Sequence, residues 1–372
     1  MAKGHELRKK PPVADVGAGH CSKAAEMTTE IAKLVLAPLD RDIDSPSDYI
    51  SHRIHLFEKL KGEYDNEVAS KRHKTINVHL PDYGRSIAET SWETTPADIA
   101  RYLGTQKLVK KIVVARVDGE LWDLERPLEG SCRLEFLKFN TPEGKTTFSK
   151  SSTHVLGQAA ELKFGCLLCL SAVAEDSFFY EVGRTSSNGT NTIIGSGDWK
   201  SLEEIAEQII TAKQKFERLV VSKENLLEMF KHNKYKLHLI SSNIADGASA
   251  TVYRCGPFID LCVGPHMRDT GKIGILEIEE RFPPGSLWHA EMDSVYRIYG
   301  ISTPKEEFLE DYNKMRPQDP EMSPQRSVSE ETELHTEHTD ETILNLETPT
   351  CARPDRNSRS SVLGMQFRFE PS

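Results

Sequence analysis

The sequence of 372 residues predicts an α+β protein with two folded units: a small sheet crossed by one helix, then a larger unit of helices on an antiparallel sheet. Short runs that alternate apolar and polar residues, bounded by turn signals, predict strands between residues 74 and 140. Capped helical segments and further strand-like runs come next, between residues 141 and 315. With 38% hydrophobic and 28% charged residues, the composition is that of a globular protein of two or three domains.

The composition also limits what the chain can do. The net charge of −10 is unevenly spread, because the chain begins basic and residues 330–347 are acidic, so a nucleic-acid surface must be local. No run approaches the roughly 20 apolar residues of a membrane span, and no secretory signal is recognisable. Seven scattered cysteines, an odd number, indicate reduced thiols. We therefore expect a soluble, cytoplasmic protein that does not contact a membrane.

The chain begins with two segments that precede the first sheet. Residues 1–46 are predicted to be an extension, because their one apolar patch, "IAKLVLAPLD", is too short for a domain. Residues 47–73 are predicted to form one amphipathic helix that packs on a later part of the chain or on a partner. Its apolar residues recur at helical spacing: Tyr49, Ile50, Ile54, Phe57, Leu60 and Tyr64.

Residues 74–140 have the pattern of a small sheet. The runs "TINVHL", "RSIAETSW", "KIVVARVDGELWDL" and "CRLEFLKF" are typical of strands. Asp118-Gly119 within the third run predicts a hairpin turn. Between the second and third runs, "TTPADIARYL" predicts a helix with Thr95 as N-cap, Pro96 at its first position and Asp98 in its first turn.

Residues 141–315 predict the second unit. A helix is expected from Ser152 to about Phe164, and a capping box of Ser201 and Glu204 predicts another to about Glu217. The segment "SKENLLEMFKHN" begins a third helix, whereas "KLHLI", "ATVYRC" and "FIDLCV" are interpreted as strands. Residues 316–372 are rich in Pro, Ser, Thr and Glu, and they are predicted to form a disordered acidic tail.

Two sets of motifs resemble a known family. The segments "INVHLPDYGR", "TTPADIA" and "VVARVDGELWDLERPLEGSCRLEFL" resemble the TGS domain, a β-grasp module of eukaryotic cytosolic threonyl-tRNA synthetases. The segments "SSTHVLGQAAELKFGCLLC", "EDSFFYEV", "TVYRCGPFIDLCVGPHMRDTGKI" and "VYRIYGIS" come after them in the order of that family's editing domain. The resemblance implies a TGS domain over residues 74–140 and an editing domain over residues 141–315.

The resemblance stops before the family's class II aminoacylation domain. We therefore expect a chain that corresponds to the front half of a synthetase, as a truncated or alternatively spliced product. ATP would be a cofactor only if the aminoacylation domain were present. The implied partner is the acceptor end of tRNA(Thr), with a full-length synthetase or a multi-synthetase complex as further possible partners.

The family's editing pocket implies a set of site residues. It draws on a helical His-x-x-x-His motif, which stands here as His154…Gln158, and on a Cys-x-x-x-His motif, which stands here as Cys262…His266. Residues four apart share one face of a helix, so His154 and Gln158 can point at the same place. Packing of an isolated His and a buried Cys is the alternative without chemistry.

Gln158 departs from the family's pattern and bears on metal binding. Related alanine-editing domains hold zinc with an equivalent quartet, but a neutral amide is a poor zinc ligand. The interpretation is therefore a pocket that handles water without a cofactor. A zinc ion held by His154, Cys262 and His266 is the alternative.

The resemblance also implies substrate contacts at Tyr180, Lys236 and Asp176. The alternatives are a core aromatic, a solvated strand lysine and a turn carboxylate. The pair Cys166 and Cys169 is interpreted as packed thiols, because no second pair stands at zinc-finger spacing.

Two functions compete. The first is hydrolysis of mischarged seryl-tRNA(Thr), which translation requires because one methyl group in a binding pocket is worth only about 1–3 kcal/mol. The second is a binding module without catalysis, which resembles a mitochondrial ribosomal protein that joins the same two modules. His154, Cys262 and His266 favour the first, because a scaffold has no chemical need for them.

Overall fold

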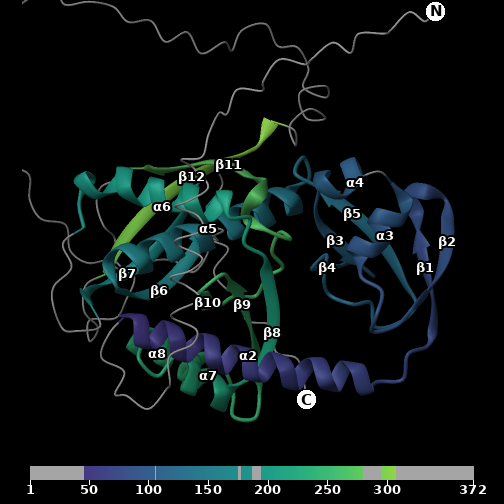
Figure 1. The fold of residues 1–372 in the computed structure, drawn as a ribbon, viewed down its shortest axis with the longest axis horizontal. Helices are drawn as coiled ribbons and strands as arrows, with labels where there is room; N and C mark the ends of the chain where they lie inside the picture. The colour runs from purple at the N-terminus through teal and green to yellow at the C-terminus, as the bar shows by residue number, and fades with distance from the viewer. Residues whose placement is uncertain (1–45, 105, 175–176, 187–193, 280–294, 307–372) are drawn as a thin grey trace, which may run out of the picture.

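The computed structural model describes residues 46–104, 106–174, 177–186, 194–279 and 295–306. It confirms the α+β class: one small sheet unit lies beside a larger unit that contains two sheets, and a long helix runs along the lower edge of the larger unit (Figure 1). Residues 1–45 of the extension predicted over 1–46, the tail at residues 316–372 and Asp176 lie outside the described residues.

The first unit is a five-stranded sheet in the order β2-β1-β5-β3-β4. β1 and β5 are parallel, and the other neighbours are antiparallel. Its elements within the described residues are β1 (Thr75–Leu80), η1 (Pro81–Tyr83), β2 (Arg85–Thr90), α3 (Pro96–Leu103), α4 (Gln106–Lys111), β3 (Ile112–Val117), β4 (Glu120–Trp122) and β5 (Cys132–Lys138). The local signals in the sequence are confirmed: Asp118 and Gly119 form the β3–β4 turn at positive φ, and Thr95 and Asp98 cap α3 reciprocally.

The second unit contains the other two sheets. The four-stranded sheet has the order β11-β12-β7-β6 and carries α5 and α6, whereas the three-stranded sheet has the order β10-β9-β8 and carries α7 and α8. Its elements within the described residues are α5 (Pro142–Phe164), β6 (Cys166–Val173), β7 (Phe178–Ser186), η2 (Ser196–Asp198), α6 (Trp199–Thr211), β8 (Phe216–Ser222), α7 (Lys223–Met229), α8 (Lys234–Asn243), β9 (Ser249–Cys255), β10 (Phe258–Leu261), η3 (Thr270–Lys272), β11 (Ile273–Glu279) and β12 (Val295–Pro304).

Helix α5 is the central element of the second unit. It begins at Pro142 because Thr141 caps it by accepting a hydrogen bond from the backbone N–H of Gly144, and it ends at Phe164 because the next residue, Gly165, adopts φ 57. Most of its middle is buried on all sides. A Cβ at Gly157 would lie 2.5 Å from the Tyr180 ring, so only glycine lets β7 approach the helix this closely.

Four expectations about the second unit were wrong. Helix α5 begins about ten residues before Ser152, and α6 ends at Thr211, since residues 216–222 form β8. The expected capping box of Ser201 is not formed: the Ser201 hydroxyl donates to the carbonyl of Asp198. The segment "KLHLI" is helical, because the Asn233 side chain accepts from the first backbone N–H groups of α8 and starts a helix there.

Helix α2 (Pro46–Ser70) packs on the second unit, although the first unit comes directly after it in the sequence. Its apolar stripe, with Tyr49, Ile54 and Phe57 nearly inaccessible, joins the core formed by α7, α8 and the three-stranded sheet. Arg53 from the same stripe pairs with Glu161 of α5 at 2.6 Å, and both side chains are at least 95% buried. The core of the second unit therefore contains residues that precede the first unit in the sequence as well as residues that come after it.

None of the helices among the described residues is both long enough and apolar enough to cross a membrane.

Replacement of Arg53 by Met should destabilise the fold by about 3–5 kcal/mol, because it leaves the carboxylate of Glu161 buried without its partner. Chemical denaturation would measure the change in the free energy of unfolding. Lys61→Met removes an exposed pair with Asp65 on the same helix and should change little. An Arg53→Met variant as stable as the Lys61→Met variant would contradict the prediction.

Candidate functional site

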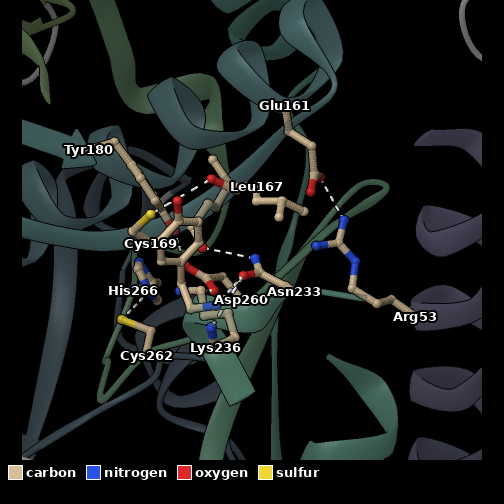
Figure 2. Close-up of polar contacts among 12 residues, drawn as sticks. Arg53, Glu161, Leu167, Cys169, Tyr180, Asn233, Lys236, Asp260, Cys262 and His266 are labelled. Atoms are coloured by element: carbon tan, nitrogen blue, oxygen red, sulfur yellow. Dashed lines mark hydrogen bonds and ion pairs between the residues drawn. The ribbon is translucent and has the colours of Figure 1, made fainter. Parts of the chain in front are cut away.

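Four of the residues singled out in the sequence lie close together where β7, α8 and the segment after β10 converge: Tyr180, Lys236, Cys262 and His266 (Figure 2). His154 and Gln158 lie one turn apart on α5, and Cys262 and His266 lie in the irregular segment that comes after β10. The rings of His154 and His266 are 4.2 Å apart between centroids. The fold thus brings together two motifs that are about a hundred residues apart in the sequence.

The irregular segment is held close to β9 by a glycine. Gly264 adopts φ 65, and a Cβ there would overlap the hydroxyl of Tyr253. The ring of Tyr253 meets the ring of His266 edge-on at 4.5 Å, and Phe216 stacks on the same imidazole at 4.8 Å. Aromatic side chains therefore pack against the imidazole of His266, which is buried.

Hydrogen bonds define the protonation of the His266 ring. The Ser151 hydroxyl has one hydrogen, which it donates to the carbonyl of Thr147 at 2.8 Å, and it accepts from the backbone N–H of Met267 at 3.0 Å. Its 3.1 Å contact with His266 Nδ1 is then satisfied when Nδ1 carries the proton. We infer that Nε2 is the acceptor, and the Cys262 thiol lies 3.3 Å from it.

Burial determines the charges in the site. Desolvation lowers the pKa of His154 to about 4, and it lowers the pKa of His266 well below its usual value. Desolvation also raises the pKa of Cys262 to about 11. At neutral pH the site therefore contains two uncharged imidazoles, which can accept or donate hydrogen bonds, and a protonated thiol, which is a poor nucleophile.

Two of the buried side chains on α5 that were singled out in the sequence have polar atoms without hydrogen-bond partners among the described residues. They are Gln158, through both atoms of its amide, and His154, through Nδ1. Both side chains are at most 2% exposed. A buried polar atom without a partner costs free energy, so these atoms indicate a place for water or a polar ligand.

Lys236, Asp260 and Tyr180 form a buried polar cluster beside the histidines (Figure 2). Lys236 Nζ lies 2.6 Å from Asp260 Oδ1, and the Tyr180 hydroxyl donates to Asp260 Oδ2. Burial alone would raise the pKa of Asp260, but Lys236, His154 and Tyr180 together hold it below its usual value. The interpretation of Lys236 as a solvated strand lysine is wrong, because it is 2% exposed and lies on a helix.

Asp260 was not predicted as a site residue, although the sequence pattern around it could have indicated one. It is a carboxylate in the otherwise apolar strand "FIDL", two residues before Cys262. Alternate residues of a strand point to the same side, so an aspartate at this position was a candidate for the same pocket.

A metal ion could be held by His154, Cys262 and His266, whose ligand atoms lie within 4.8 Å of one another. Zinc bound to nitrogen and sulfur at about 2.0–2.3 Å would need these atoms roughly 3.3–3.8 Å apart. The three side chains fit such an ion if they close in and if Cys262 loses its proton. The cysteines Cys166 and Cys169 are buried in β6 as free thiols, as expected from the sequence.

Replacement of Lys236 by Met should destabilise the second unit by about 3–5 kcal/mol, since it leaves Asp260 charged and unpaired in the interior. The double variant Lys236→Met/Asp260→Leu should recover part of this loss, because no buried charge remains. Denaturant titration would compare both with Lys223→Met, which breaks a 2.7 Å pair with the exposed Asp246 and should change little. Equal losses in the single and double variants would contradict the explanation.

Comparison with known proteins places these features in a family context. Residues 76–138 match the TGS domain, and residues 250–299 match the threonyl and alanyl tRNA synthetase second additional domain. The cytoplasmic threonine–tRNA ligase of Saccharomyces cerevisiae is 39% identical over 301 residues, which are 78% of this chain and 41% of the yeast protein. The cytoplasmic enzyme of Caenorhabditis elegans is 41% identical over 270 residues, which are 72% of this chain and 36% of the worm protein.

The cytoplasmic threonine–tRNA ligase 1 of Rattus norvegicus gives the same picture, with 40% identity over 296 residues that cover 41% of its length. The chain thus spans less than half the length of the curated relatives it matches. It combines a TGS domain with the threonyl and alanyl tRNA synthetase second additional domain, and it resembles the amino-terminal part of the cytoplasmic threonine–tRNA ligases.

Proposed function

We propose that this chain is a cytoplasmic editing deacylase that hydrolyses seryl-tRNA(Thr) and spares threonyl-tRNA(Thr). The observation that carries the proposal is the close approach of two uncharged, buried imidazoles, one turn of α5 from a buried amide without hydrogen-bond partners. The ligand is the aminoacylated 3′ end of tRNA(Thr). This chain would bind only the acceptor end of the tRNA, and a full-length synthetase or a multi-synthetase complex would bind the rest of it.

Ester hydrolysis needs a positioned water, an acceptor for its proton and donors for the oxyanion. The acceptor is Nδ1 of His154, which has no hydrogen-bond partner, or Nε2 of His266 once the Cys262 thiol turns away from it. The amide of Gln158 can donate to the ester carbonyl as negative charge develops. When the tetrahedral centre collapses, the bond from the carbonyl carbon to the ribose oxygen breaks, the oxygen takes the proton from the imidazole, and serine leaves.

Cys262 shapes the pocket and does not attack, because its raised pKa keeps the thiol protonated. Lys236 and Tyr180 act through Asp260, which they hold in place beside His154. Direct contacts from Tyr180, Lys236 and Asp176 to the substrate stay predictions. Discrimination against threonine requires only that the pocket be too small for one further methyl group, as in a second sieve.

His154→Ala and His266→Ala should each lower the rate of seryl-tRNA(Thr) deacylation by roughly 10²–10⁴-fold, since each removes a group that holds or deprotonates the water. Cys262→Ser should keep part of the activity, because a serine hydroxyl can still donate to His266 Nε2. Release of labelled serine from seryl-tRNA(Thr), with and without a chelator, would measure these rates. His55→Ala, at an exposed position on α2, serves as the control.

A zinc mechanism predicts a different pattern: the chelator stops the reaction, and Cys262→Ser is as damaging as either histidine change. A wild-type chain that hydrolyses seryl-tRNA(Thr) no faster than buffer would eliminate the deacylase and leave a binding module.

A further inference from the structure

A side chain of the first unit reaches the pocket of the second unit. Asp123 comes directly after β4, and its Oδ1 accepts a hydrogen bond from the backbone N–H of His266 at 3.0 Å. Its Oδ2 accepts from the Tyr253 hydroxyl at 2.7 Å. One carboxylate therefore holds both the backbone of His266 and the aromatic ring that contacts its imidazole.

The position of Asp123 is determined by the core of the first unit. Leu124 and Leu128, on the same loop, are at most 2% exposed and belong to that core. Their backbones are tied to the segment around α3: the Leu124 carbonyl accepts from Ala97 at 2.9 Å, and the Leu128 N–H donates to Thr94 at 2.9 Å. The carboxylate is thus presented by a loop that cannot move independently of its domain.

The segment that bears His266 is held by single hydrogen bonds from several elements. Residues 262–267 form neither helix nor strand: the Cys262 N–H donates to the Thr251 carbonyl, the Gly264 carbonyl accepts from Lys150, and the Met267 N–H donates to Ser151. The backbone N–H of His266 is buried with its residue, which is 1% exposed, and it would be costly to leave without an acceptor. Tyr253 supports the same segment by lying against Gly264, where a Cβ would overlap its hydroxyl.

We propose that Asp123 is a positioning residue for hydrolysis, so that the first unit completes the pocket of the second by holding His266 in its working orientation. The proposal rests on the deacylase function proposed above. It assigns the TGS domain of this chain a part in the chemistry of the editing pocket, separate from any contact with RNA. Asp123 does not touch the substrate, since both of its oxygens are directed at Tyr253 and His266.

Steady-state deacylation by variants of the full chain tests the proposal. Asp123→Ala should lower kcat roughly 10- to 100-fold with little change in KM, because a displaced imidazole weakens catalysis more than it weakens tRNA binding. Asp123→Asn should restore most of the rate, since its amide oxygen can still accept from the His266 N–H. Tyr253→Phe, which removes one of the two hydrogen bonds, should cost about fivefold.

The control is a neighbouring contact across the same interface. Glu125 forms an ion pair with Arg268 at 2.6 Å. These two residues lie two positions after Asp123 and His266 in the sequence, and Glu125 does not contact His266. Glu125→Gln should keep the wild-type kcat. If Glu125→Gln loses as much kcat as Asp123→Ala, docking of the two units explains the effect and the proposal is overturned.

A second measurement does not depend on the reaction. In chains labelled with ¹⁵N-histidine, the nitrogen shifts of His266 should report one neutral tautomer with the proton on Nδ1, as the Ser151 contact requires. Asp123→Ala should mix the tautomers, whereas Asp123→Asn and Glu125→Gln should not. A wild type that does not hydrolyse seryl-tRNA(Thr) refutes the deacylase, and the ring signal then still decides whether Asp123 positions His266.

Thermal unfolding of Asp123→Ala shows whether the variant has lost only the orientation of the His266 ring or has lost its fold. If Asp123→Ala unfolds at the assay temperature, Tyr253→Phe carries the test through its kcat and its ring signal. An Asp123→Ala chain that is folded, with the wild-type kcat and an unchanged His266 signal, would overturn the proposal.

Discussion

The ion pair between Lys236 and Asp260 is the interaction on which the site depends. Asp260 lies on β10 of the three-stranded sheet, Lys236 lies on α8, and Tyr180 reaches the same carboxylate from β7 of the four-stranded sheet. A single buried carboxylate therefore links both sheets of the second unit. Because a buried charge without a partner is very costly, the three elements must keep their relative positions, and this constraint also fixes the start of the segment that leads to Cys262 and His266.

The same burial gives the site its chemistry. Desolvation favours the uncharged form of an imidazole and of a thiol, so it leaves His154 and His266 neutral and Cys262 protonated at pH 7. Asp260 stays charged in the same surroundings only because Lys236, His154 and Tyr180 compensate its burial. Burial therefore leaves the two imidazoles and the thiol uncharged, whereas the Asp260 carboxylate stays charged because it has a charged partner in Lys236.

The order of the chain also bears on the site. Helix α2 precedes the first unit and packs on the second, where Arg53 neutralises Glu161 on the helix that carries His154. The first unit then returns to the second through Asp123, which contacts His266. The second unit therefore receives support from two segments that precede it: one pairs with the helix that carries His154, and the other contacts His266. This arrangement explains why a site in the second unit is held by residues from the amino-terminal part of the chain.

The sequence by itself determined the elements whose signals are local. The hairpin at Asp118-Gly119, the cap at Thr95 and the i, i+4 spacing of His154 and Gln158 each depend on a few consecutive residues, and each is found in the structure. The tertiary structure decided the role of Asp260 and the contacts of Ser151 and Asp123 with His266. These contacts join residues 24 to 143 positions apart. No local pattern encodes them, because each exists only where packing of distant segments has removed water from both partners.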